Sequence, residues 1–224
     1  MELNVLVSCE YSGVVRDAFI ELGHNAMSCD LLATYSPGSH YQGSVLDVMD
    51  DGWDCMIAHP PCTHLSVSGA RQFAAKRLDG RQQGGIDFFM KMINAKIPSI
   101  GVENPVCIMS TVFRKPDQTV QPWMFGHMEQ KATCLWLKNL PLLVPTNNVR
   151  AEMMLQPRSV RERIHLLPPS PDRWKLRSVT YKGLADAMAR QWSDYIIKQK
   201  KEAARIIKSA PEIVLKNSSG IVFN

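Results

Sequence analysis

The chain has 224 residues, of which 45% are hydrophobic and 21% charged, an ordinary balance for a globular protein with one well-packed domain. Its formal net charge of +5 permits a polyanionic partner without requiring one. No apolar run approaches the roughly 20 residues that span a bilayer, and Glu10 interrupts the first apolar stretch, which argues against a secretory signal. We therefore expect a cytoplasmic protein without membrane contact.

Short apolar runs alternate with helical patterns in the first half of the chain, which is typical of an α/β protein with a parallel sheet. The predicted strands are 4–9, 24–29, 53–58 and 99–102, and the predicted helices are 14–22 and 85–95. Three of these strands end in polar or reactive residues, namely Asp30, His59-Pro60-Pro61 and Glu103-Asn104-Pro105. Open α/β sheets bind ligands outside the carboxyl ends of their strands, so we expect the site there.

The second half of the chain is less regular. Residues 132–137 predict a strand with Trp136 in its core, and 183–197 predict an amphipathic helix that the basic stretch 198–205 continues. That stretch is either a phosphate contact or a solvated helix face. We expect one catalytic domain over 1–200, followed by a basic helix end and tail over 201–224. A short apolar run, 212–215, lies in this tail.

The six cysteines sit mostly in or beside apolar runs, and no CxxC pair occurs, which disfavours disulfides and a structural zinc site. We expect reduced thiols and no metal. The cysteines are Cys9, Cys29, Cys55, Cys62, Cys107 and Cys134.

Cys62 is the candidate nucleophile. It stands in Pro60-Pro61-Cys62-Thr63-His64, where two prolines stiffen the backbone and fix its position at a strand exit. A nucleophilic cysteine needs a lowered pKa, which His59, His64 or Arg71 could supply. The alternative is a buried structural thiol after a tight turn.

Glu103 is the second candidate, in Gly101-Val102-Glu103-Asn104-Pro105. A carboxylate at a strand end can bind the edge of a base, donating to a ring nitrogen when protonated and accepting from an amino group. The same segment also fits a helix start with Asn104 as the cap and Pro105 at the first helical position.

These two clusters, in this order and 41 positions apart (103 − 62), resemble the cytosine-C5 DNA methyltransferases, and most of all their short, phage-encoded members. The resemblance covers residues 4–106 well. It implies a Rossmann-like S-adenosylmethionine-dependent methyltransferase fold, a mostly parallel twisted sheet with helices on both faces. It also implies DNA and S-adenosylmethionine as partners, and the host cytoplasm as the location of a phage-encoded enzyme.

The resemblance further implies roles for individual residues. Cys62 would attack the cytosine ring, Glu103 would hold its opposite edge, and Asn104 would orient the loop. Arg161 and Arg163, in Ser159-Val160-Arg161-Glu162-Arg163, resemble a motif whose arginines support the active-site loop and the base. Their alternative is a solvated charge run.

For the cofactor, the resemblance points to the segment after the first strand and to the ends of the next ones. Gly13 would let the backbone approach the methionine moiety, and Asp30 would bind the ribose hydroxyls. The adenine contact is either Ser44 or Asp47, with a slight preference for Asp47. The expected cofactor-binding residues are Glu10, Ser12, Gly13, Asp30, Asp47 and Pro60.

Several departures from the family pattern bear on the substrate. Thr63 replaces the usual Gln, Leu65 an aromatic and Pro105 a Val, and the closing Gly-Asn-Ser-Val segment is missing. Only 20 positions (183 − 163) separate Arg163 from Gly183, too few for a target-recognition region. Residues 107–158 are therefore the candidate substrate-contacting insertion, with aromatic and basic side chains interleaved over 121–146.

The predicted function is methyl transfer from S-adenosylmethionine to cytosine C5 through a covalent Cys62 adduct. The alternatives are a weak or inactive DNA-binding module with the same fold, and modification of free cytosine nucleotides. A Cys-His hydrolase using Cys62 and His64 is disfavoured, because adjacent loop positions rarely give the needed geometry and no third orienting group is evident.

Overall fold

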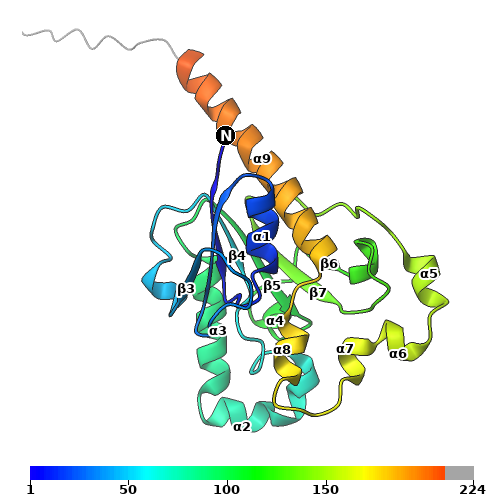
Figure 1. Ribbon diagram of the computed structural model, residues 1–224. Coiled ribbons are helices and arrows are strands. Elements are labelled where there is room, and N and C mark those ends of the chain that lie inside the picture. The colour runs from blue at the N-terminus through cyan, green and yellow to red at the C-terminus, as the bar shows by residue number, and fades with distance from the viewer. Residues whose placement is uncertain (210–224) are drawn as a thin grey trace, which may run out of the picture.

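The computed structural model describes residues 1–209, which build one seven-stranded sheet flanked by helices (Figure 1). The strand order is β3-β2-β1-β4-β5-β7-β6. Strands β1 to β5 pair in parallel, and β7 runs antiparallel to both β5 and β6. The strands are β1 (Asn4–Ser8), β2 (Asn25–Asp30), β3 (His40–Gln42), β4 (Cys55–Ala58), β5 (Ser99–Pro105), β6 (Gln118–Val120) and β7 (Thr133–Lys138).

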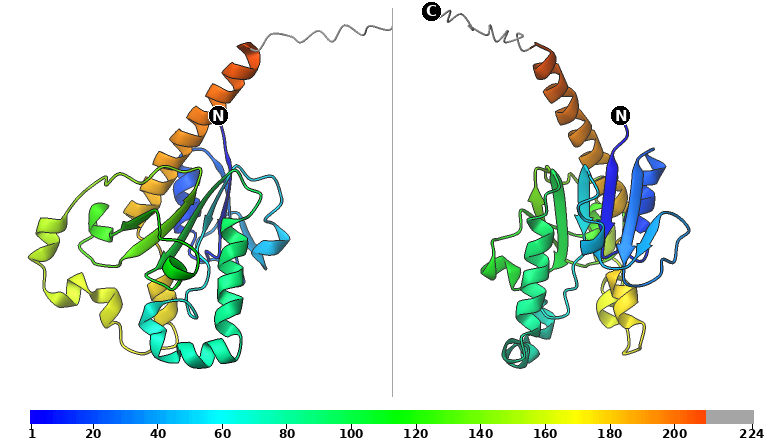
Figure 2. Two further views of the ribbon diagram at one scale, coloured as in Figure 1. Left: turned by 180° about the vertical axis from the view of Figure 1, so that it is seen from behind. Right: turned by 90° about the vertical axis from the view of Figure 1, so that its left-hand side faces the viewer.

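Helices cover both faces of the sheet, so the predicted Rossmann-like α/β fold is confirmed (Figure 2). The α-helices are α1 (Val14–Glu21), α2 (Phe73–Leu78), α3 (Arg81–Ile93), α4 (Met109–Val112), α5 (Arg150–Met154), α6 (Arg158–Arg161), α7 (Arg163–Leu166), α8 (Arg173–Ser178) and α9 (Lys182–Ser209). Short 3-10 helices span Val45–Asp47, Val67–Gln72 and Pro122–Met124.

Two hydrophobic cores, one on each face, hold the layers together. Along β1, Val5 and Val7 pack on the side of α1 and α9, whereas Leu6 packs on the side of α3. Successive side chains of a strand point to opposite faces, so a strand covered on both faces must be apolar throughout. This explains why the central strands read as continuous apolar runs in the sequence. Trp136 is fully buried in β7, as predicted.

The register of the parallel strands places the residues that follow them along one edge. Ser8 of β1 pairs with Cys29 of β2 and with Ala58 of β4, and Ala58 in turn pairs with Val102 of β5. The next residues along each strand therefore lie side by side at the carboxyl edge. This edge carries the candidate site.

The structure corrects the predicted end of β5. Glu103, Asn104 and Pro105 continue the strand, because they pair with 133–135 of β7. The alternative of a helix start at Asn104 is therefore wrong, and the next helix, α4, begins at Met109. Neither β3 nor β6 was predicted.

The segment 107–158, expected as an insertion, is in part integral to the sheet, since β6 and β7 belong to it.

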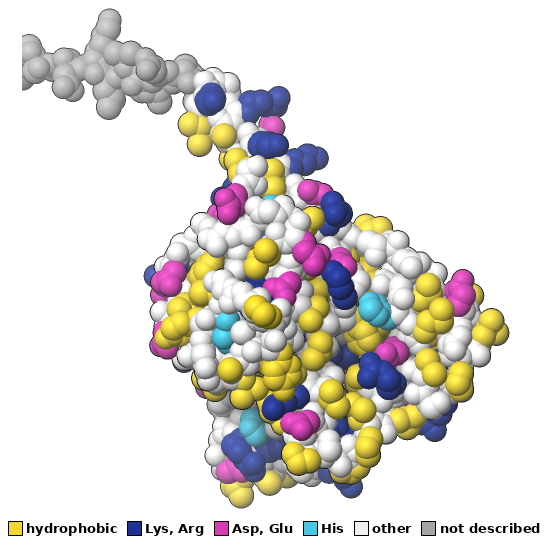
Figure 3. All heavy atoms as spheres, in the orientation of Figure 1, with side chains coloured by type: hydrophobic (Ala, Val, Ile, Leu, Met, Phe, Trp, Pro, Cys, Tyr) yellow, Lys and Arg dark blue, Asp and Glu magenta, His cyan; other side chains and the backbone are white. Residues whose placement is uncertain are grey.

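The basic stretch 198–205 continues α9, as predicted. Lys200 pairs with Asp54 at the amino end of β4, the edge of the sheet opposite the candidate site. Figure 3 shows Lys and Arg side chains along this protruding end of α9. The structure thus gives no support for a phosphate contact there with a substrate at the candidate site. The apolar run 212–215 lies outside the described residues.

None of the helices within residues 1–209 combines the length and the apolar character that crossing a membrane requires. All six cysteines are free thiols.

Candidate active site

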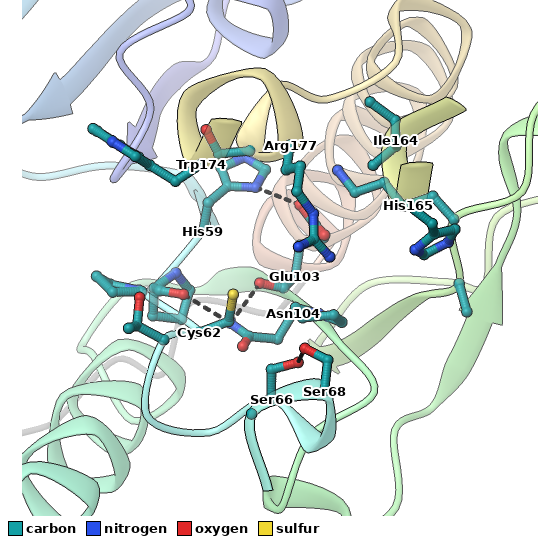
Figure 4. Close-up of a pocket in the computed structure, with 18 residues that line it drawn as sticks. His59, Cys62, Ser66, Ser68, Glu103, Asn104, Ile164, His165, Trp174 and Arg177 are labelled. Carbon is teal, nitrogen blue, oxygen red and sulfur yellow. Dashed lines mark hydrogen bonds and ion pairs between the residues drawn. The ribbon is translucent and has the colours of Figure 1, made fainter. Parts of the chain in front are cut away.

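His59 and Glu103 form a buried pair at the carboxyl edge of the sheet. Because Ala58 and Val102 are register partners, the residues after them are neighbours on adjacent strands. The His59 Nδ1 lies 2.8 Å from the Glu103 Oε2, and each side chain is only 10% exposed (Figure 4). The sequence placed both residues at strand ends, but it gave no indication that they contact each other.

The surroundings of this pair favour opposite charges on its two side chains. Burial by itself would lower the pKa of His59, but the hydrogen bond and the negative charge of Glu103 outweigh it and raise that pKa. Burial would likewise raise the pKa of Glu103, yet the contact with His59 and the charge of Lys131 lower it. Both directions favour an ionised carboxylate beside a protonated imidazole.

The loop that carries Cys62 is fixed from several sides. The Asn104 side chain donates from Nδ2 to the Pro60 carbonyl oxygen at 2.9 Å, so it contacts the loop that it was expected to orient. The Lys76 ammonium donates to the Thr63 carbonyl oxygen at 2.7 Å. The side chain of Leu65, where the resemblance led us to expect an aromatic, is fully buried in the core. The loop is therefore a preorganised support for the thiol.

Cys62 is only partly buried, and the structure corrects the expected state of its thiol. Burial and the nearby Glu103 carboxylate raise its pKa, while a backbone hydrogen bond, Lys131 and Arg177 act in the opposite direction without prevailing. The expectation of a lowered pKa is wrong for the protein without a bound substrate. Thiolate formation here depends on the balance between Glu103 and the two cations.

Cys62 and Glu103 line one cavity of about 340 Å³ (Figure 4). The opposite wall comes from the short helices near the end of the chain, through His165, Trp174 and Arg177. These three residues were not predicted, because no local sequence pattern indicates that α7 and α8 fold back over the strand ends. Lys131 also lines this cavity, so the basic segment before β7 does reach it.

Arg161 and Arg163 do not line this cavity, although their neighbours Ile164 and His165 do. The Arg163 guanidinium instead lies 2.9 Å from the Glu129 carboxylate, which also accepts a hydrogen bond from the Tyr181 hydroxyl at 2.7 Å. This arrangement ties α7 to the start of α9. The cation facing Cys62 from this part of the chain is Arg177.

The segment after β1 is organised around the helix that follows it. The Glu10 carboxylate accepts hydrogen bonds from the Val15 and Arg16 backbone amides at 2.7 and 3.2 Å, and from the Ser12 hydroxyl at 3.2 Å. Glu10 thus satisfies free amides at the amino end of α1 and complements the helix dipole. Its first role is structural.

Gly13 makes room for a buried arginine. Its φ is +77°, and a Cβ there would lie 2.6 Å from the Arg16 Nη2. Arg16 is fully buried and donates to the carbonyl oxygens of Ser36 and Pro37. The structure therefore accounts for this glycine by packing within the chain, in place of the expected approach of backbone to the methionine moiety.

A second cavity of about 140 Å³ lies beside the first on the same edge. Asp30 lines it, with one carboxylate oxygen accepting from the Leu32 amide at 2.9 Å. Of the two adenine-contact candidates, Ser44 lines this cavity and Asp47 does not, since Asp47 accepts a hydrogen bond from the Tyr41 hydroxyl.

Apolar side chains make up much of the wall of this second cavity, among them Leu31, Val45 and Phe88. Pro61 borders both cavities, whereas Pro60 borders only the larger one. The larger cavity thus gathers acidic, basic and thiol groups, and the smaller one holds a single carboxylate beside two thiols, Cys9 and Cys29. The arrangement suits two different molecules bound next to each other.

Within residues 1–209, no cluster of three or more His, Cys, Asp or Glu residues has a metal-binding arrangement.

No protein-family model and no curated protein sequence matches the chain. Among solved structures, the chain is similar to the methyltransferase EhMeth of Entamoeba histolytica, with 11% sequence identity and a TM-score of 0.47. The similarity covers 94% of this chain and 100% of that one. A likeness this low carries no argument about chemistry, so the function has to be inferred from the site itself.

Proposed function

We propose that the chain is an S-adenosylmethionine-dependent enzyme that methylates C5 of cytosine in DNA, with Cys62 bonding covalently to the ring. The observation that carries this proposal is that a thiol and a carboxylate, Cys62 and Glu103, line one cavity at the carboxyl edge of an α/β sheet. A second cavity meets the first at Pro61. One ring and one methyl donor can therefore be held side by side.

The residues of the smaller cavity fit the ribosyl-adenine part of S-adenosylmethionine. The Asp30 carboxylate has one oxygen left after its bond to the Leu32 amide, which suits a ribose hydroxyl. Val45 and Phe88 offer apolar surface to the adenine ring, and Ser44 offers a hydroxyl to its edge. When bound, the cofactor supplies an electrophilic methyl group.

Cys62 provides the activation that this methylation needs. Cytosine C5 is a poor nucleophile, but a thiolate bonded to C6 makes C5 enamine-like and able to attack an electrophilic carbon. Lys131 and Arg177 favour the thiolate at this position. Asn104 keeps the Cys62 loop in place through the Pro60 carbonyl.

Glu103 provides the contact to the opposite edge of the ring. It lines the cavity beside Cys62, and its carboxyl group can engage the ring nitrogen and the amino group of cytosine. A target base in duplex DNA has to leave the stack to enter the cavity, at a cost of roughly a few kcal/mol.

A second candidate substrate is a free cytosine nucleotide. The short helices α7 and α8, which occupy the place in the sequence where a target-recognition region would be, form a wall of the cavity. A small substrate would need no further recognition surface. This observation concerns the substrate alone and leaves the reaction unchanged.

The proposal is tested by incubating the protein with methyl-labelled S-adenosylmethionine and three substrates in parallel: duplex DNA, single-stranded DNA and cytidine nucleotides. Mass analysis of the nucleosides should show 5-methylcytosine from wild type and none from Cys62→Ser. DNA binding without transfer to any substrate would instead support a binding module. Transfer by Cys62→Ser at the wild-type rate would refute the covalent scheme.

A further inference from the structure

His59 has no role in the proposed reaction so far, although its imidazole forms a buried hydrogen bond with the Glu103 carboxylate. Among residues 1–209, only the His59 Nδ1 forms a hydrogen bond with the Glu103 carboxylate. His59 also lines the larger cavity and directly precedes the Pro60-Pro61-Cys62 loop. It is therefore positioned to influence both the carboxylate and the ring that the cavity receives.

The chemistry of the ring poses a requirement that Glu103 alone does not meet. When a thiolate adds to C6, negative charge develops in the ring, and a proton on the ring nitrogen neutralises it. An ionised carboxylate has no proton to donate. Burial opposes ionisation of Glu103, but the 2.8 Å contact with His59 favours the ionised form. A neighbouring group has to supply the proton.

We infer that His59 holds this proton and passes it through Glu103 to the ring nitrogen of the bound pyrimidine. The inference rests on the proposed function, because it assigns a proton source to the same site. His59 acts through Glu103 and is thus a positioning residue.

The step balances without any further reactant. The thiolate electron pair of Cys62 forms the bond to C6, and the electron pair of the C5–C6 double bond moves into the ring towards the nitrogen. The proton leaves Nδ1 of His59 for the Glu103 carboxylate, and the carboxyl proton goes to the ring nitrogen. Neutral His59 keeps its remaining hydrogen on Nε2. When the sulfur leaves C6 at the end of the reaction, the proton returns by the same route.

The charged groups around His59 are consistent with a proton held on its imidazole. Glu103 on β5 and Glu10 after β1 both raise the pKa of His59, whereas burial and Lys131, which precedes β7, lower it. Cys62, on the loop after β4, lines the same cavity. The Nε2 atom is buried and has no hydrogen-bond partner among the described residues, so Glu103 is the only hydrogen-bond partner of the imidazole within that part of the chain.

The test compares wild type with His59→Asn over a range of pH. Asparagine can keep a hydrogen bond to the Glu103 carboxylate but carries no titratable proton. We expect kcat at pH 7.5 to fall about 100-fold, in the range of a lost general acid. The alkaline limb of the pH profile should move about one pH unit or more to lower pH, because Glu103 must then carry the proton itself. A loss of the same factor at every pH would overturn the inference.

His24→Asn is the matched control, because His24 is also buried but lies just before β2, at the amino edge of the sheet. It should keep the wild-type pH profile. Melting temperatures of both variants show whether a loss of activity merely reflects unfolding.

Nuclear magnetic resonance of labelled imidazole nitrogens separates this inference from the proposed function, since it needs no substrate. Wild-type His59 should be doubly protonated at pH 7, and Glu103→Gln should lower its pKa. A neutral His59 at pH 7 in wild type would overturn the inference. Absence of methyl transfer to any substrate by wild type would overturn the proposed function without bearing on the resonance result.

Discussion

The two cavities at the carboxyl edge of the sheet differ in their chemistry. The larger one gathers a thiol, a carboxylate and cations, with Cys62, Glu103, His59, Lys131 and Arg177 on its walls. The smaller one has mostly apolar walls, with the thiols of Cys9 and Cys29 and a single carboxylate, that of Asp30. A cavity of the first kind can move protons and stabilise developing charge, and one of the second kind can bind a largely apolar ring in a fixed orientation. A substitution in the larger cavity should therefore change the chemistry at Cys62 and spare the affinity for S-adenosylmethionine, and a substitution in the smaller cavity should do the reverse.

The largest effect is expected from Cys62→Ser in the larger cavity. Serine keeps the shape of the side chain but removes the nucleophile, so methyl transfer should fall by at least about 1,000-fold. Calorimetry should show unchanged affinity for S-adenosylmethionine, because Cys62 does not line the smaller cavity. A parallel loss of cofactor affinity would show that the two cavities are not separate in function.

Asp30→Asn is the reciprocal substitution in the smaller cavity. It retains an oxygen that can accept from the Leu32 amide but removes the charge offered to the ribose. The Kd for S-adenosylmethionine should rise about tenfold or more, as expected for one lost hydrogen bond to a charged group. The rate of Cys62 alkylation should stay the same. An unchanged Kd would place the cofactor elsewhere.

The pH dependence of Cys62 alkylation tests the electrostatics of the larger cavity. Since burial and Glu103 raise the pKa of the thiol, the thiolate fraction at neutral pH should lie below that of a free cysteine. Alkylation by iodoacetamide, followed peptide by peptide with mass spectrometry, should accelerate only at alkaline pH. Glu103→Gln removes a negative charge and should shift the midpoint to lower pH. A shift to higher pH would contradict this assignment.

The two halves of the chain differ in how much of their structure the sequence predicts. The central strands and α1 were predicted within a few residues, because a strand buried on both faces must be a continuous apolar run. The short edge strands β3 and β6 have three residues each and no apolar pattern, so they were missed.

For the site, the sequence indicated that Cys62 and Glu103 both stand at the carboxyl ends of predicted strands, and they do share a cavity. It could not predict that Glu103 would pair with His59, because that depends on the register of β4 and β5. It also could not show that Arg177, and neither Arg161 nor Arg163, would face the thiol. That outcome is set by how the short helices fold over the strand ends.

The smallest effect is expected at Gly13, which lies just before α1 and leaves room for the Arg16 side chain. It lines neither cavity. Gly13→Ala combines a left-handed φ with a Cβ that would meet Arg16, which should cost about 2 kcal/mol. The melting temperature should fall by about 4–8 °C. Gly23→Ala is the control, since it shares the left-handed φ but would meet no atom within 4 Å. An equal fall in melting temperature in both variants would show that the contact with Arg16 does not contribute to the destabilisation.

In the proposed reaction the Cys62 sulfur bonds to C6 of a cytosine held by Glu103. This bond can be trapped with an oligonucleotide or nucleotide that carries 5-fluorocytosine, incubated with S-adenosylmethionine. Fluorine cannot leave C5 as a proton does, so an adduct formed on the enzyme should persist. Mass spectrometry of the digested protein should find the added nucleotide mass on the peptide containing Cys62, and Cys62→Ser should show no adduct. An unmodified Cys62 peptide, under conditions where the same protein methylates ordinary cytosine, would contradict the account.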